Sequence, residues 1–212
     1  MDLKDFRQNY DLDKLKKKHL DPNPINQFKN WMKDAVNAEC LEPNAMVLAT
    51  LNKDMVPTSR VVLLKEVLDG EFVFYTNYES DKARDISVNN KVSLVFNWLK
   101  VHKQIRVEGI ASKVSKEVSE AYFQSRPIES QIGAYASPQS KVIENRKVLK
   151  QNLRDTISRF EGLDKLPLPD NWGGYTINPF MIEFWQGRES RLHDRFRYTK
   201  QGNDWKLDRL AP

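Results

Sequence analysis

Basic side chains inside or beside short apolar segments are the feature of this sequence with the clearest chemical potential. An arginine fork matches two phosphate oxygens at once, and a lysine supplies a compact positive charge. A helix that begins after Ser80 would add backbone N–H groups and a favourable dipole end. Any one of these cations taken alone is more simply explained by a surface ion pair with Asp or Glu. The residues are Arg60, Lys65, Lys82, Arg126, Arg191 and Arg195.

His193 lies between two of these cations, Arg191 and Arg195. A histidine seen alone is more often structural than catalytic, but cations on both sides disfavour a charged imidazole. A neutral imidazole could bind a ligand oxygen, and its tautomer stays open. Two residues apart in an extended segment, Arg191 and His193 would share one face and could grip one ligand together.

Other chemical signatures are absent from the sequence. It contains no GxGxxG, Walker, GxSxG or HExxH motif, which excludes the common nucleotide-binding and hydrolase patterns. The single cysteine, Cys40, and the three histidines lack zinc-ligand spacing, so no metal site is expected. The net charge of +5 raises the question of nucleic acid. Outside the run at 16–18 the basic residues alternate with acids, so we expect no nucleic-acid partner.

The elements that must position these residues are mostly short β segments. Asn23 and Pro24 open an amphipathic helix, and a short helix is expected to start at Ser80. Because strands outnumber helices and no βαβ order occurs, we predict a mainly β (α+β) fold. Its antiparallel strands would curl into a barrel with peripheral helices. Strands are expected at 45–50, 57–65, 71–77, 92–98, 103–115, 173–187 and 196–210. Hairpin turns are expected at 52–54 and 69–70, and the last strand segment is expected to bend at 201–203. Further helices are expected near 116–125 and 140–160.

Length and composition indicate one folded domain. A chain of 212 residues with 40% hydrophobic residues is long enough for one core. We expect a single domain over 23–212, after a flexible segment at 1–22. That segment mixes acidic and basic residues and lacks an apolar run. Neither a secretory signal nor a membrane span is therefore expected, and the cytoplasm is the default location.

Six motifs stand out by their length and order. They are RVVLLK (60–65), FYTN (74–77), YFQSRPIESQIGAYASPQS (122–140), WGGY (172–175), EFWQGRESRLHDR (183–195) and WKLDRLAP (205–212). Together they resemble the pyridoxine (pyridoxamine) 5′-phosphate oxidase family from about residue 44 to the end of the chain. The resemblance implies a split β-barrel with FMN at the interface of a homodimer. It also implies oxidation of pyridoxamine and pyridoxine 5′-phosphates to pyridoxal 5′-phosphate. Hydride would pass from C4′ to flavin N5, and oxygen would reoxidise the flavin to give hydrogen peroxide.

The resemblance also implies roles for individual residues. In a catalytic pair, Arg191 would cover the substrate ring and His193 would bind its 3-oxygen. A segment within 1–22 resembles the family's N-terminal lid and would act as an active-site lid. FMN contacts fall on Arg60, Val61, Val62, Leu63, Leu64, Lys65, Tyr75, Thr76, Lys82, Gln104, Gln139, Ser140, Trp185 and Arg195. Substrate contacts fall on Arg7, Tyr10, Lys65, Tyr122, Arg126, Ser130, Arg191 and His193.

Some of these assignments have alternatives, and one position departs from the family pattern. Tyr75 and Trp185 could be core aromatics, which is the usual role of aromatics in strands. Tyr122 lies four residues before Arg126, so the two would share a helix face and reach one phosphate. Asp81 stands where the family usually has arginine, which argues for weaker FMN binding. Two alternative functions remain. The chain could be another split-barrel flavin reductase or binding protein, or a non-catalytic protein that binds phosphate or nucleic acid.

Overall fold

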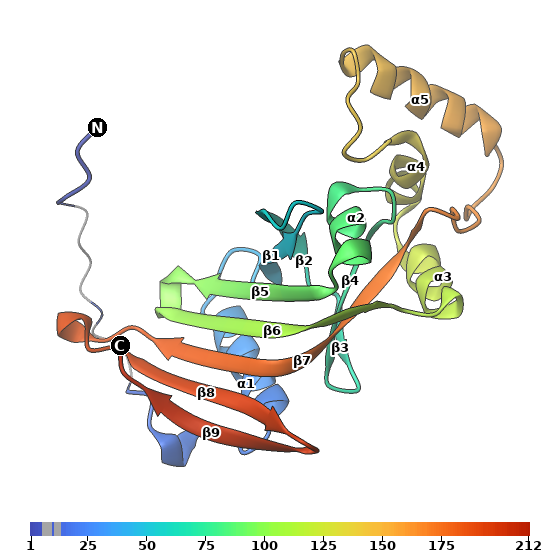
Figure 1. Ribbon diagram of the computed structural model, residues 1–212. Coiled ribbons are helices and arrows are strands. Elements are labelled where there is room, and N and C mark those ends of the chain that lie inside the picture. Colours follow the sequence, from blue (N-terminus) through green and yellow to red (C-terminus); the bar gives the residue numbers. More distant parts are fainter. Residues whose placement is uncertain (6–9, 11–13) are drawn as a thin grey trace.

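The structure is a computed structural model that describes residues 1–5, 10 and 14–212 (Figure 1). Within these residues the chain forms one nine-stranded antiparallel sheet and five α-helices. The sheet order is β2-β1-β5-β6-β7-β4-β3, with β8 on β7 and β9 on β8. The predicted mainly β fold, with a curled antiparallel sheet and peripheral helices, is confirmed.

The bounds of the elements follow the predicted segments closely. The strands are β1 (Ala45–Leu51), β2 (Pro57–Leu63), β3 (Glu66–Leu68), β4 (Glu71–Asn77), β5 (Lys91–Trp98), β6 (Lys103–Lys113), β7 (Trp172–Gln186), β8 (Asp194–Gln201) and β9 (Asp204–Leu210). The helices are α1 (Pro24–Asn37), α2 (Asp81–Val88), α3 (Lys116–Ser125), α4 (Ile128–Ala136) and α5 (Arg146–Arg159).

The long strand β7 divides the sheet into two arms. One edge of β7 pairs with β6 along nearly its whole length. On the other edge, residues 172–177 pair with β4 and residues 181–186 pair with β8. Pro179, which has no N–H to donate, lies between these two stretches and opposite a register shift at Glu108/Gly109. The sheet therefore forks at β7, with β4 and β3 on one arm and β8 and β9 on the other.

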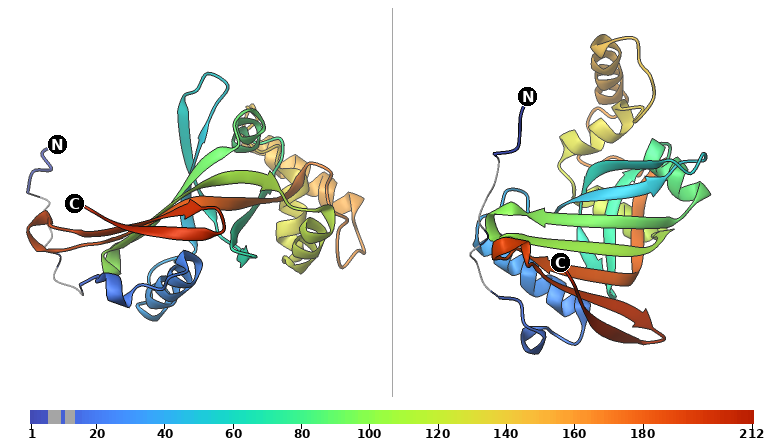
Figure 2. Two further views of the ribbon diagram at one scale, coloured as in Figure 1. Left: turned by 60° about the horizontal axis from the view of Figure 1, so that its bottom comes forward. Right: turned by 60° about the vertical axis from the view of Figure 1, so that its left-hand side comes forward.

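Helix α1 covers one face of the sheet, and helices α3 to α5 gather at one end of it (Figure 2). The side chain of Asn23 caps α1 by accepting a hydrogen bond from the Ile25 N–H at 2.9 Å. Phe28 packs edge-on against Phe72 and Phe96, with ring centroids 4.9 and 5.0 Å apart. Alternating residues of the strands supply the rest of this core, as the period of two predicts.

The structure corrects several element predictions. The helix expected over 140–160 begins only at Arg146, and the preceding α4 and the three-residue strand β3 were not predicted. The bend predicted at 201–203 is confirmed as the turn of the β8–β9 hairpin, which begins at Asp194, two residues earlier than expected. None of the helices in the described part of the chain is long and apolar enough to cross a membrane.

Candidate active site

A cavity of about 1000 Å³ lies between β2, β4, α2 and the α3–α4 segment. Its volume is at the upper end of the range for ligand pockets, so it can hold more than one ring system. The cavity collects residues that the sequence scatters over several elements. The predicted site residues that line it are Arg60, Val61, Val62, Leu63, Lys65, Tyr75, Thr76, Lys82, Tyr122, Arg126, Ser130, Gln139 and Ser140.

Lys82, in the first turn of α2, is a buried cation of this cavity, with 8% of its surface exposed. Its Nζ donates to Thr76 Oγ1 at 3.3 Å, and no carboxylate of the described residues forms an ion pair with it. Burial lowers the pKa of Lys82, and the nearby charge of Arg60 lowers it further. The charge of Asp81 offsets part of this shift. Two neighbouring cations, of which Lys82 forms no close ion pair among the described residues, fit an anionic ligand such as a phosphate.

Arg60 is held in place by three side chains that lie behind it. Its Nη1 donates to Thr50 Oγ1 and its Nη2 to Thr58 Oγ1, both at 2.7 Å. Both hydroxyls donate in turn to Asp85 Oδ2, at 2.7 and 2.8 Å, and Asp85 lies 3.5 Å from Arg60 Nη2. The role of Asp85 was missed, although Thr50 and Thr58 face each other across the predicted β1–β2 hairpin.

Asp81, the departure from the family pattern, lines the same cavity. It forms an ion pair with Arg84, one turn along α2, and both side chains are at least half exposed. The acid is therefore partly neutralised by its own helix. Ser80 occupies the N-cap of α2 as predicted, but its hydroxyl donates to the Asn77 carbonyl instead of capping the helix.

Aromatic rings and a second cation form another part of the cavity wall. Tyr75 stacks on Tyr122 with ring centroids 3.8 Å apart, and the plane of Trp172 is nearly parallel to both rings. Tyr75 donates its hydroxyl to Glu66 at 3.1 Å, and burial raises the pKa of Tyr75, so this phenol stays protonated. Tyr75 is therefore a wall residue of the cavity and not simply a core aromatic.

Arg126 follows the end of α3, where it is the extended C-cap residue. The prediction that Tyr122 and Arg126 share a helix face is therefore wrong, although both line the cavity. The Arg126 guanidinium lies 4.8 Å from the centre of the Trp172 ring. Its Nη1 is buried and has no hydrogen-bond partner among the described residues. A buried, unused guanidinium donor fits the phosphate of a second ligand.

The remaining predicted residues lie elsewhere in the chain. The Leu64 side chain is buried in the main core, and Arg7 is outside the described residues. A second cluster forms around Trp185, whose ring lies 4.6 Å from that of His193. The Tyr10 ring lies edge-on to His193 at 5.5 Å and to His102 at 4.7 Å. Gln104, Arg191 and Arg195 belong to the strands and turn of the same region.

His193 is held by a backbone donor. Its Nδ1 accepts a hydrogen bond from the Arg188 N–H at 3.0 Å, so the proton of the neutral ring is on Nε2. Burial lowers the pKa of His193, and the charge of Arg191 lowers it further. A neutral imidazole with an Nε2–H donor follows. The prediction that Arg191 and His193 share one face of an extended segment is wrong, because Glu189–Arg191 form a 3₁₀ turn and Arg191 has a φ of 60°.

Arg195 is oriented by a buried acid on the neighbouring strand. Its Nε and Nη2 donate to Glu183 Oε1 at 2.9 and 2.8 Å, and its Nη1 donates to the Ala211 carbonyl at 3.0 Å. Arg106 lies 3.5 Å from the other oxygen of Glu183. Glu183, 4% exposed, was not singled out as a site residue, although it belongs to the 183–195 motif.

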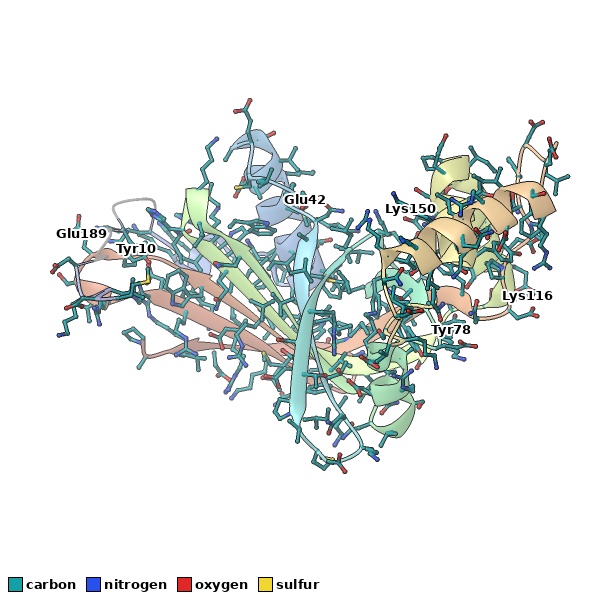
Figure 3. All side chains as sticks on the ribbon, turned by 90° about the horizontal axis from the view of Figure 1, so that it is seen from above. Tyr10, Glu42, Tyr78, Lys116, Lys150 and Glu189 are labelled. Atoms are coloured by element: carbon teal, nitrogen blue, oxygen red, sulfur yellow. The ribbon has the colours of Figure 1, made fainter. Side chains whose placement is uncertain are left out.

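The cavity and the second cluster lie at opposite ends of β7. Trp172 begins the strand and Trp185 is next to its end, thirteen residues later. At about 3.3 Å per residue this separation is roughly 40 Å. Figure 3 shows Tyr10 and Glu189 at one end of the molecule and Lys116 and Lys150 at the other. One chain therefore does not bring the two halves of the predicted site together.

The family models divide the chain in the same way. Residues 32–159 match the model described as pyridoxamine 5′-phosphate oxidase. Residues 172–212 match the model described as the pyridoxine 5′-phosphate oxidase C-terminal dimerisation region. A relative from Cyanothece sp. named pyridoxine/pyridoxamine 5′-phosphate oxidase is 48% identical over 210 residues, which cover 99% of this chain and 98% of the relative.

Solved structures agree with this match. PhzG from Burkholderia lata, in complex with tetrahydrophenazine-1-carboxylic acid, is 30% identical with a TM-score of 0.88, covering 95% of this chain and 99% of its own. A pyridoxamine 5′-phosphate oxidase-related, FMN binding protein from Nostoc punctiforme shares the fold at 15% identity and a TM-score of 0.71, covering 87% of this chain and 97% of its own. The chain therefore belongs to the pyridoxamine 5′-phosphate oxidase family.

Proposed function

We propose that this chain is an FMN-dependent oxidase that converts pyridoxamine 5′-phosphate and pyridoxine 5′-phosphate to pyridoxal 5′-phosphate. The observation that carries this proposal is the presence of two cationic subsites in one cavity. Lys82 with Arg60 forms the first, and Arg126 beside stacked aromatic rings forms the second. Two phosphorylated ring ligands, a flavin and a B6 vitamer, would need two such subsites.

In this proposal the first subsite binds the FMN phosphate and the second binds the substrate phosphate. Lys82 and Thr76 would hold the flavin phosphate, with Arg60 beside them. Arg126 would hold the substrate phosphate through its unused Nη1 donor. Tyr122, Ser130 and Lys65 would contribute further contacts to the substrate. When bound, FMN supplies the acceptor for the hydride of C4′ and, with oxygen, the route to hydrogen peroxide.

We further propose that the protein works as a homodimer with FMN at the interface. The second cluster holds residues expected to contact flavin and substrate, but it lies roughly 40 Å along β7 from the cavity of its own chain. A two-fold pairing would bring the second cluster of one protomer to the cavity of the other. The match of 172–212 to a dimerisation region supports this arrangement, because that region contains Trp185, His193 and Arg195.

The second cluster would then fix the substrate ring. The Nε2–H of His193 would donate to the substrate 3-oxygen, a role that requires the neutral imidazole. Arg191 would cover the ring on the side away from the flavin. Tyr10 would come from an N-terminal lid that closes over the substrate, since its ring already lies against His193. The single cysteine agrees with a reducing compartment, and we propose the cytoplasm.

The test is an oxidase assay with purified, FMN-loaded protein in air-saturated buffer. Pyridoxamine 5′-phosphate should give equimolar pyridoxal 5′-phosphate, ammonia and hydrogen peroxide, and pyridoxine 5′-phosphate should give the aldehyde without ammonia. Tetrahydrophenazine-1-carboxylic acid, the ligand of the Burkholderia lata neighbour, tests the second candidate substrate class, an unphosphorylated ring acid. Turnover of that acid without turnover of either B6 phosphate would refute the proposal.

A further inference from the structure

The WGGY motif at 172–175 begins β7, and the proposed function leaves it without a role. Trp172 lines the cavity but is only 7% exposed. Its plane lies within 9° of Tyr75 and within 4° of Tyr122, with centroid distances of 5.6 and 6.2 Å. The indole is thus part of an aromatic wall that joins β4, α3 and β7.

The same indole also supports Arg126. The guanidinium lies 4.8 Å from the Trp172 ring and 5.6 Å from the Phe123 ring, both within cation–π range. Phe123 packs against Trp172 at 5.1 Å, so the two rings form one surface under the cation. Arg126 itself is outside the helix, and its Nη1 has no partner among the described residues. Among the described contacts of this guanidinium, the aromatic surface is therefore its support.

The two glycines of the motif let tyrosine side chains pack directly against the backbone of β7. A Cβ at Gly174 would lie 2.8 Å from Tyr75 Cε1, and a Cβ at Gly173 would lie 2.2 Å from the Tyr78 hydroxyl oxygen. Either contact would push a tyrosine away from the strand. The bare backbone after Trp172 thus lets Tyr75 lie flat beside the indole and close to Tyr122.

We propose that Trp172 is a positioning residue for the substrate phosphate, because its indole holds the Arg126 guanidinium and aligns the Tyr122 ring. This inference rests on the proposed function, which makes the ligand of Arg126 a B6 phosphate. The indole itself need not touch the phosphate. It keeps a desolvated guanidinium in one orientation, so that the unused Nη1 donor is preorganised to bind the phosphate.

The experiment measures equilibrium binding of pyridoxal 5′-phosphate and of pyridoxal to the FMN-loaded protein. Trp172→Leu removes the π surface, and Trp172→Phe keeps a smaller one. For Trp172→Leu we expect roughly tenfold weaker binding of pyridoxal 5′-phosphate, within the range of a desolvated cation–π contact. Pyridoxal, which has no phosphate, should bind with unchanged affinity, and the FMN content should stay the same. Trp172→Phe should lose about threefold for the phosphate ligand alone.

A double-mutant cycle with Arg126→Ala supplies the control. If Trp172 acts through Arg126, then Trp172→Leu should have no further effect on pyridoxal 5′-phosphate binding once Arg126 is gone. Equal weakening of pyridoxal and its phosphate, or additive effects in the cycle, would overturn the inference. If Trp172→Leu does not fold, the same two comparisons made with Trp172→Phe decide the matter.

Failure of the proposed role of Trp172 can be distinguished from failure of the proposed oxidase function. Phosphate-dependent binding that responds to Trp172, in a protein without oxidase turnover, would support the positioning role and refute the oxidase. Turnover of pyridoxamine 5′-phosphate with wild-type KM in both Trp172 variants would support the oxidase and refute the positioning role.

Discussion

Replacement of Lys82 tests the proposed flavin-phosphate subsite directly. Lys82→Met keeps an unbranched side chain only one atom shorter and removes its charge. A hydrogen bond to a charged group contributes roughly 1.5–3 kcal/mol, and each 1.4 kcal/mol is a factor of ten in affinity. We therefore expect the dissociation constant of FMN to rise roughly 10- to 100-fold. Riboflavin, which has the same ring but no phosphate, should bind both proteins equally.

The same substitution should stabilise the protein without flavin. Burial lowers the pKa of Lys82, so the folded chain binds this proton less readily than the unfolded chain does. The wild-type apoprotein should thus gain stability as the pH rises from the folded pKa toward the ordinary value for lysine, a gain that Lys82→Met lacks. At neutral pH the apo variant should melt higher than wild type, and each kcal/mol corresponds to about 2–4 °C for a chain of this size.

The assay combines flavin fluorescence titrations with melting curves of the apo and FMN-loaded proteins. Lys91→Met, at an exposed lysine that begins β5, is the matched control and should change neither quantity. Equal losses of FMN and riboflavin affinity would refute a phosphate role for Lys82. An apo variant that melts lower than wild type would refute the argument that the buried ammonium destabilises the apoprotein.

Three further predictions concern the cavity charge, the histidine and the dimer. Asp81→Arg should tighten FMN binding by about tenfold, because it replaces an acid at the cavity with a cation, and an unchanged titration would mean that residue 81 points away from the phosphate. Arg191→Gln should shift the acid limb of the kcat/KM–pH profile upward, since Arg191 lowers the pKa of His193; an unmoved limb would contradict this. Dilution to monomers should release flavin on sizing chromatography, and a monomer that keeps stoichiometric FMN would refute the shared site.

The sheet could be predicted from the sequence because its signals are local. Alternating apolar residues in 92–98 and 45–50 give a period of two that the buried face of β5 and β1 preserves. Helix α4 could not be predicted in this way. It begins at Ile128, its N-cap residue Pro127 makes no side-chain cap, and Gln131 ties it to the Leu166 N–H, 35 residues away. Strand β3 has only three residues and depends on its pairing with β4.

The residues that line the cavity could be predicted from the sequence, but the residues behind them, which hold them in place, could not. Residues that line the cavity, such as Arg126 and Lys65, were predicted from motifs, because the residue types in a motif indicate its chemistry. The residues that support them were missed. Asp85 reaches Arg60 only after α2 has packed across the β1–β2 hairpin, and Trp172 reaches Arg126 only after β7 has joined β4. Such contacts depend on tertiary structure, which spacing along the chain does not encode.

The fork at β7 constrains how this protein can change in evolution. A single inserted or deleted residue in β7 would turn the side chains beyond it to the opposite face of the sheet. Such a change near Pro179 would displace Trp185 and Glu183 while Trp172 stayed in place, so the two ends of the strand would no longer match. Length variation is therefore expected to accumulate in the segment at 160–171, before β7, while the spacing from Trp172 to Trp185 is inherited unchanged.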